Sequence, residues 1–326
     1  MGRLTIAICF ASVAFGQQLD RIFQLKNATN VINRKEIAIA LRQLAHVEEP
    51  SIDNVDGTLT VTGTVDQLTL AEWLVPRLDV AEASDQGPQE YRVSGNPDDV
   101  VVVLGLVNTT TISDVQEICA TLRSVANIRT IAPIVVSRII TLRDSANNIA
   151  LAESLLPKLD LMAQPRQEPS INEFKLSGSD DIVMVYGLAH TDGAMRIQEV
   201  TAELRSVLDI PKIFPVTTSS LLAIRCRPNQ LQVLKWLIPE LDRQTASFSG
   251  NEVHVPGNDD DVMRVFYLSH PTSRRALSDL LTEVHRTAHI MKAYAHATPP
   301  ALVVRGTEAQ IATATQMIEL ADREAQ

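Results

Sequence analysis

Four histidines near the C-terminus come nearest to a metal site, by their spacing, of any residues in this 326-residue chain. His285 and His289 are four residues apart, so on a helix they would lie one turn apart and could share a metal ion, with His270 and His296 nearby. The matching positions elsewhere in the chain hold other residues. Solvated surface histidines are therefore the simpler interpretation, and we predict no metal site.

Repeated acidic clusters suggest a second kind of site, because calcium prefers several oxygen ligands. The clusters are Asp98-Asp99, Asp180-Asp181 and Asp259 to Asp261. Each follows a glycine in a segment that reads as a turn before a strand, where aspartate is expected for turn geometry alone. The turn interpretation is the simpler one and needs no bound calcium.

Two further polar positions recur along the chain. They are Glu36, Glu117, Glu199 and Asp279 in one predicted helix, and Gln67, Asn148, Gln230 and Gln310 in another. Catalytic groups are seldom repeated four times, so we interpret these positions as common packing or a common docking surface. The sequence also lacks a Gly-rich phosphate loop with lysine, a Gly-x-Ser-x-Gly elbow and a His-Glu-x-x-His motif. We predict no catalytic residue, no cofactor and a protein that is not an enzyme.

Composition and charge restrict the choice of partners. The chain is 45% hydrophobic, carries a formal net charge of −10 and has a pI near 5.2. A surface that follows nucleic-acid phosphates needs clustered Lys and Arg, so nucleic acid is not an expected partner.

The N-terminus predicts export. Arg3 precedes an apolar run from Leu4 to Phe15 that ends at Gly16, which is typical of a secretory signal peptide over residues 1–16. No later apolar stretch approaches the ~20 residues that cross a bilayer, so we expect no transmembrane segment after signal cleavage. Of the cysteines that remain, Cys119 and Cys226, we favour buried single thiols, although the sequence leaves their pairing open.

The elements that would position all these residues form an internal repeat. A strand leucine and a helix-ending acid recur 54 residues apart: Leu25 and Asp79, Leu106 and Asp160, Leu188 and Asp242, Leu268 and Asp322. Spacings of this length indicate small domains in series rather than solenoid turns. We place the four units at residues 17–80, 91–161, 172–243 and 252–326.

Each unit reads as strand, helix, strand, strand, helix. The first helix has N-cap candidates at Thr29, Thr110, Asp192 and Thr272. In the second helix, apolar residues at steps of three, four and three form one stripe, as in Leu68, Ala71, Val75 and Leu78. These patterns predict an α+β fold of four tandem two-layer βαββα modules, with one sheet face partly open. Between units we expect a short strand and a turn, hence short structured linkers.

The repeat resembles the periplasmic N-domains of bacterial secretins (NolW-like, ring-building βαββα units), the channels of type II and III secretion and type IV pilus systems. The resemblance rests on the opening strands Ile22 to Leu25 and Val265 to Leu268, the strand Leu302 to Thr307, and the helix Gln67 to Asp79. It implies units that assemble side by side and bind envelope proteins. The sequence stops at Gln326 with no region that alternates like barrel strands, so we expect such modules without the secretin channel domain.

Three functions compete at this stage. The favoured one is an exported periplasmic scaffold, outer-membrane associated or not, that binds protein partners, as a homo-oligomer or with secretin or pilus components. The alternative is a periplasmic ligand-binding protein or enzyme of unknown class with a site between modules. A KH-like nucleic-acid binder would need a Gly-x-x-Gly loop and a basic groove, and the sequence shows neither.

Overall fold

The computed structural model describes residues 18–83, 87–162, 168–191, 193–246, 252–257, 260–269 and 273–324. The predicted signal peptide, residues 1–16, lies outside them. Within these ranges no helix is long and apolar enough to span a bilayer.

The first module contains a three-stranded antiparallel sheet and two helices. Its elements are β1 (Leu19–Gln24), α1 (Val31–Ala45), β2 (Ser51–Asp53), β3 (Thr58–Gly63) and α2 (Val65–Leu78). The strand order is β1-β3-β2, so the strand that precedes the second helix is central.

The other three modules repeat this plan and add one edge strand. The second module has β4 (Gln89–Arg92), β5 (Asp99–Gly105), α3 (Ile112–Val125), β6 (Thr130–Ile134), β7 (Ile139–Ser145) and α4 (Ala146–Leu159). The third has β8 (Ser170–Lys175), β9 (Ile182–Gly187), α5 (Ala194–Leu208), β10 (Ile213–Val216), β11 (Leu221–Cys226) and α6 (Pro228–Leu241). The fourth has β12 (Glu252–His254), β13 (Asp261–Tyr267), α7 (Arg274–Thr287), β14 (Lys292–Ala297), β15 (Pro300–Thr307) and α8 (Glu308–Glu324).

The α+β fold of four tandem modules is confirmed. Each added strand forms an antiparallel hairpin with the opening strand of its module, as the turn residues between units predicted. The described starts of the first two connecting segments are anchored, because the Ser137 hydroxyl donates to the Val80 carbonyl and the Ser219 hydroxyl to the Leu161 carbonyl.

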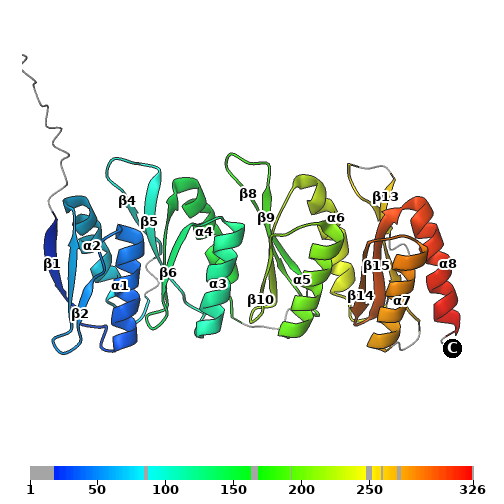
Figure 1. Ribbon diagram of the computed structural model, residues 1–326, viewed down its shortest axis with the longest axis horizontal. Coiled ribbons are helices and arrows are strands. Elements are labelled where there is room, and N and C mark those ends of the chain that lie inside the picture. Colours follow the sequence, from blue (N-terminus) through cyan, green and yellow to red (C-terminus); the bar gives the residue numbers. More distant parts are fainter. Residues whose placement is uncertain are drawn as a thin grey trace, which may run out of the picture.

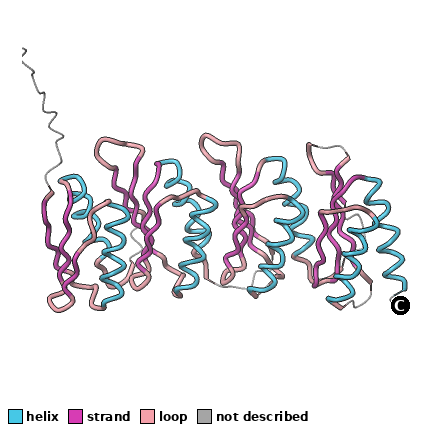
Figure 2. Tube along the Cα trace, viewed as in Figure 1, coloured by secondary structure: helices cyan, strands magenta, loops and turns pink. Residues whose placement is uncertain are grey.

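Sheets and helix pairs alternate along the molecule as layers of one stack (Figures 1 and 2). The buried cluster of the first module includes Val101, Val103 and Ile134 from the second module's sheet. The second and third modules likewise share buried clusters with the sheets that follow them. The expectation of a partly open sheet face is therefore wrong for modules two to four, whose sheets have helices on both faces.

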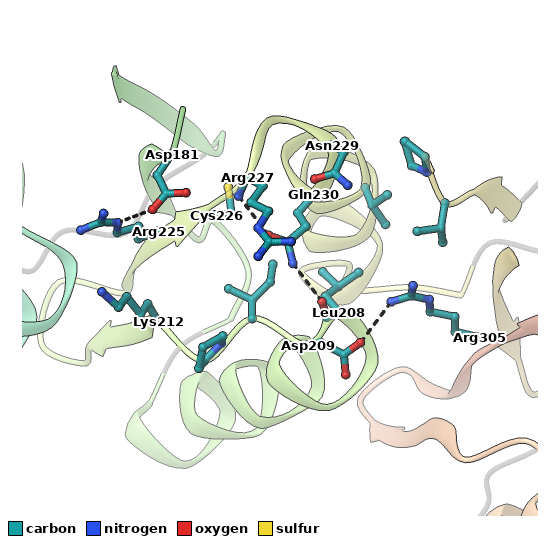
Figure 3. A pocket seen from close by; sticks show the side chains of 15 residues that line it. Asp181, Leu208, Asp209, Lys212, Arg225, Cys226, Arg227, Asn229, Gln230 and Arg305 are labelled. Carbon is teal, nitrogen blue, oxygen red and sulfur yellow. Dashed lines mark hydrogen bonds and ion pairs between the residues drawn. The ribbon is translucent and has the colours of Figure 1, made fainter. Parts of the chain in front are cut away.

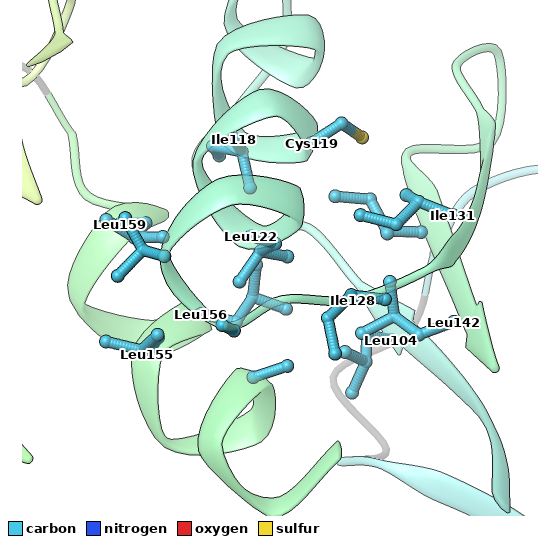
Figure 4. Close-up of a cluster of buried hydrophobic side chains, with 14 of the residues drawn as sticks. Leu104, Ile118, Cys119, Leu122, Ile128, Ile131, Leu142, Leu155, Leu156 and Leu159 are labelled. Carbon is cyan, nitrogen blue, oxygen red and sulfur yellow. The ribbon is translucent and has the colours of Figure 1, made fainter. Parts of the chain in front are cut away.

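The second module shows how the core is built. Figure 4 shows side chains of α3 and α4, such as Leu122 and Leu156, directed toward Ile128 and the sheet residue Leu142. All four are at most 6% exposed. Truncating a buried leucine to alanine costs about 2–5 kcal/mol, so each module needs this layer.

The outer layers of the stack are more polar than the inner ones. Thr58 and Thr62 of β3 stand at the positions of Ile139 and Arg143 of β7, which face the preceding helices. In α7, exposed Thr287 stands where α1 has buried Leu44. A polar outer surface on the end layers is the usual property of terminal repeats.

The first helices begin one residue later than predicted. Asn30 and Thr111, not Thr29 and Thr110, accept hydrogen bonds from the free amides of Asn33 and Asp114. Helix α5 follows Gly193 without a side-chain cap, and Ser273 caps α7. Asp192 and Thr272 lie outside the described residues.

Candidate functional site

The most regular polar feature is the acid that ends each module, Asp79, Asp160, Asp242 and Asp322, here called the closing aspartates. The Asp160 carboxylate accepts hydrogen bonds from the amides of Val107 (2.6 Å), Asn108 (3.1 Å) and Thr109 (2.7 Å). Asp79 binds the amides of residues 26–28 and Asp242 those of residues 189–191 in the same way. Asp322 accepts from the Ser269 amide.

This contact explains the constant spacing in the sequence. Three successive amides after the opening strand need acceptors, and a carboxylate held at the end of the last helix supplies them. The same loop precedes the first helix, and that helix begins one residue after the predicted N-cap candidate. The closing aspartates are therefore structural, and Asp79, Asp160 and Asp242 are at most 9% exposed.

An arginine at each of the three module junctions connects neighbouring modules. Arg143, Arg225 and Arg305 lie at the same position of β7, β11 and β15 and pair with Asp99 (2.6 Å), Asp181 (2.8 Å) and Asp261 (2.6 Å). Each also donates to a carbonyl of the preceding module's first helix, at Leu44, Val125 (3.5 Å) and Val207 (2.9 Å). We call these contacts the junction clamps.

The clamps account for the acidic clusters that suggested calcium. One aspartate of each cluster neutralises the clamp arginine, whose side chain is only 11–14% exposed. Within the described ranges, no three His, Cys, Asp or Glu side chains come together as a metal site would require. Among the described residues, no helix layer precedes the first module, and there the clamp position is Thr62, which donates to Asp20 (2.6 Å).

Two of the four repeated helix acids, Glu36 and Glu117, meet the hairpin turn of the following module. The Glu117 carboxylate accepts from the Thr217 amide (2.8 Å) and hydroxyl (2.7 Å). Hydrogen bonds from the Val135 and Val136 amides lower the pKa of Glu36, although its burial outweighs them and leaves the pKa raised. Glu199 makes no hydrogen bond or ion pair with the described residues.

The repeated helix amides are also structural. Gln67, Gln230 and Gln310 accept from the backbone amide three residues earlier and donate to the carbonyl that ends the first helix, at His46, Leu208 and His289. Asn148 donates instead to Asp144 (2.8 Å). The three glutamines therefore fix the two helices of their module to each other, which fits the packing alternative of the sequence interpretation.

A pocket of about 440 Å³ lies at the third junction, between modules three and four. Figure 3 shows the cationic side chains of Lys212, Arg225, Arg227 and Arg305 around it, with Asp181 and Asp209. Arg225 and Arg305 are held by the clamps, and Lys212 donates to the Asn127 side chain (2.8 Å). Burial and the nearby Arg225 charge lower the pKa of Lys212.

Cys226 also lines this pocket but is a poor nucleophile. Burial raises the pKa of its thiol to about 12, and burial raises that of Cys119 to about 11. Only a thiolate attacks readily, so both side chains stay protonated and unreactive near neutral pH. The two cysteines are free and buried, as the sequence favoured.

The third junction also contains a buried acid and histidine that face each other across the modules. His296 of β14 lies 3.0 Å from Glu203 of α5, measured from Nδ1 to Oε1, and the two side chains are 4% and 0% exposed. The other ring nitrogen, Nε2, lies 2.8 Å from the Thr298 carbonyl, which can only accept, so Nε2 carries a proton. A further proton must then lie between Nδ1 and the carboxylate.

Both groups of this pair hold protons more tightly than usual. Burial raises the pKa of Glu203 by more than His296 lowers it. For His296, burial lowers the pKa, but the hydrogen bond and negative charge of Glu203 outweigh it and raise the pKa. In the sequence, His296 lies near His285 and His289, and nothing there indicates Glu203, which belongs to another module.

The remaining histidines do not join this pair. His285 is half-buried in α7, and His289 follows the helix end with its carbonyl bound to Gln310. His270 lies outside the described residues.

No protein-family model matches the sequence, and no curated protein does either. Similar solved structures include Dim2p from Pyrococcus horikoshii, with 13% identity over 44% of this chain and 90% of that chain, at a TM-score of 0.24. Aeromonas hydrophila ExeD matches with 13% identity over 89% and 60% at 0.17, and the ETEC pilotin–secretin complex AspS–GspD with 19% over 69% and 38% at 0.17. Scores this low carry no argument about function.

Proposed function

We propose that this protein is an exported, non-enzymatic scaffold that binds other proteins along the edges of its stacked sheets. The observation that carries the proposal is that the repeated polar residues make their contacts inside the stack. Closing aspartates, clamp arginines and helix amides bind within the stack, so the features that recur on its outside are strand edges and hairpins. Free strand edges are natural sites for protein assembly.

The arrangement of these features suits a partner that contacts several modules. The β4–β5 and β8–β9 hairpins project from the same side of the stack, at the top of the view in Figure 1. Because the junctions fix the modules, these hairpins keep a constant spacing. The resemblance of the repeats to secretin N-domains leads us to expect partners among secretion or type IV pilus components of the cell envelope.

The test is photocrosslinking of the full chain in a bacterial envelope. A benzophenone side chain at Ser94 or Ser177, both exposed in these hairpins, should capture a defined envelope protein or a second copy of the chain. The matched control is Thr69, which is exposed on α2. Equal crosslinking from all three positions, or none, would refute the proposal. Mass spectrometry of the same material should show an N-terminus at Gln17 if the chain is exported.

The alternative is a ligand-binding role for the pocket at the third junction. Arg227, whose guanidinium forms no ion pair with the described residues, stands where the second module has the helix-capping Ser145. A small anion could sit beside it. Titration with inorganic phosphate tests this role, and Arg227→Ser should abolish any binding.

A further inference from the structure

The last sheet ends in a strand edge whose backbone groups point outward. Strand β14 lies at the edge of the order β12-β13-β15-β14, and Ala297 pairs with Pro300. The Pro300 carbonyl accepts from the Leu268 amide (2.9 Å), on the opposite side from β14. Ala297 and Pro300 are thus a non-hydrogen-bonded pair. Because such pairs alternate, the N–H and C=O groups of Ala293 and Ala295 and the N–H of Ala297 face the free edge.

The equivalent edges of the second and third sheets are blocked in two ways. Pro133 of β6 and Pro215 of β10 stand at the position of Ala295 and offer no N–H. Proline at such a position is a known protection of an edge strand. The next outward amide, that of Thr217 in the third module, is taken by the Glu117 carboxylate, as that of Val135 is by Glu36.

Both blocks are missing from β14. Ala295 keeps its N–H, and Glu199 of the preceding helix layer accepts no hydrogen bond from the described residues, including Ala297. The strand also has six residues, whereas β6 has five and β10 four. Of the corresponding edges in the four modules, β14 is therefore the one prepared for pairing, since β2 has only three residues.

A groove runs beside this edge, between α5 and α7. It has a volume of about 260 Å³ and is lined by Leu277 and Leu281 of α7 together with Tyr294, Ala295 and Ala297. Alanines 293, 295 and 297 stand where β6 and the residue after it have Ile131, Pro133 and Val135, so smaller side chains leave this space. Its two walls carry opposite charges, Glu199 on α5 and Arg274 at the start of α7.

We propose that the β14 edge binds an extended segment of a protein partner as an added strand. This inference rests on the proposed function and names one site for it. The backbone of the segment pairs with Ala293, Ala295 and Ala297. Its side chains alternate between the two walls of the groove. Those that face α7 are apolar, with one acidic residue near Arg274, and those that face α5 include a basic residue near Glu199. The charge of the two walls thus sets the orientation of the segment.

The probe is an octapeptide selected from a random library against the full chain, with binding measured by fluorescence anisotropy. Ala295→Pro removes one outward N–H and should weaken binding about tenfold, which corresponds to about 1.4 kcal/mol, a normal value for one hydrogen bond. Ala295→Thr keeps the amide and favours a strand, so it should bind within a few-fold of the natural chain. Arg274→Glu should weaken a peptide with an acidic residue and favour its lysine variant.

We expect Ala295→Pro to fold normally, because proline already occupies the same position in the second and third modules. Thermal unfolding of Ala295→Pro should match that of the natural chain. Hydrogen exchange should show the Ala295 and Ala297 amides protected only when peptide is bound. Equal peptide affinity for Ala295→Pro, or no peptide selected at all, would overturn the inference. The scaffold proposal would survive either result if the hairpin crosslinks at Ser94 and Ser177 persist.

Discussion

The first and third junctions are built on one plan but differ at their centres. At the first, Ala40 of α1 and Ile134 of β6 belong to a fully apolar cluster. At the third, the same positions hold Glu203 and His296, which are equally buried. The clamp arginine is common to both, whereas the acid-to-turn contact of Glu36 has no counterpart at Glu199. The centres of equivalent layers can therefore be apolar or contain a buried titratable pair.

The comparison separates the contacts that every junction has from those that only one junction has. The clamp occurs at all three junctions, so it belongs to the stacking of a sheet on the preceding helices. The buried pair occurs once, so stacking does not need it. A buried ion pair is weak evidence for stability, but loss of one partner is costly because a buried charge stays behind.

The largest effect should come from breaking that pair. His296→Ile leaves Glu203 buried without a partner and should destabilise the third junction by about 3–5 kcal/mol. The double variant Glu203→Ala with His296→Ile copies the first junction and should recover most of this loss. Urea unfolding followed by Trp236 fluorescence, with Trp73 replaced by Phe, reports on the third module. Similar losses in the single and double variants would contradict the comparison.

The clamps of Arg143 and Arg305 should contribute equally to the stability of the first and third junctions. Arg143→Met and Arg305→Met each remove a guanidinium from a half-buried aspartate and a helix carbonyl, and each should cost about 2 kcal/mol. Hydrogen exchange at the ends of α1 and α5 measures the loosening separately for each junction. Thr62→Arg, at the clamp position that faces no helix layer, serves as the control and should change neither. A large loss at one junction only would show that the clamps are not equivalent.

The third junction should weaken as the pH rises, and more than the first, where burial raises the pKa of Glu36 but lowers that of His46. Both pKa values of the pair are raised in the folded protein, so the folded state binds more protons than the unfolded state. Stability is then complete at low pH. It begins to fall as the pH rises above 4.5, the ordinary glutamate value, and falls more steeply above 6.5, the ordinary histidine value, with a slope of at most about 1.4 kcal/mol per pH unit from each group. Urea midpoints from pH 6 to 9 measure it. The slope should vanish in the Glu203→Ala, His296→Ile variant.

The smallest effect concerns the acid-to-turn contact. Glu117→Gln weakens two hydrogen bonds to Thr217 and should cost about 1 kcal/mol at the second junction. Glu199→Gln should cost less than this at the third, because that carboxylate makes no hydrogen bond or ion pair with the described residues and acts on Glu203 and His296 only through its charge. Thermal melts compare the two variants directly, and an equal loss of stability for both would contradict this difference between the second and third junctions.

The sequence was sufficient to predict the modules, because a closing aspartate fixes a spacing of 54 residues and leaves a visible repeat. The repeated amide position was interpreted as common packing or a common docking surface, and the contacts of Gln67, Gln230 and Gln310 fit the packing alternative. The covered sheet faces were missed, although a signal was present. Residues 100–104 of β5 form an unbroken apolar run, which is typical of a strand buried on both faces, whereas β1 contains Asp20, Arg21 and Gln24.

The pair at the third junction could not be predicted in the same way. Glu203 and His296 are 93 residues apart, and their positions hold Ala40 and Ile134 at the first junction, so the repeat gives no indication of contact. Only the stacking of sheet on helix brings them together. The clamps were equally hidden, because an aspartate before a strand is expected for its turn alone.

The junctions should join the four modules into one rod, which can be tested by measuring the distance between the first and last modules. Spin labels at Thr69→Cys on α2 and Thr313→Cys on α8, both exposed sites, are attached after Cys119 and Cys226 are replaced by alanine. Pulsed electron paramagnetic resonance should give one narrow distance distribution between the two labels. A broad distribution would mean that the modules move independently, and it would contradict the account.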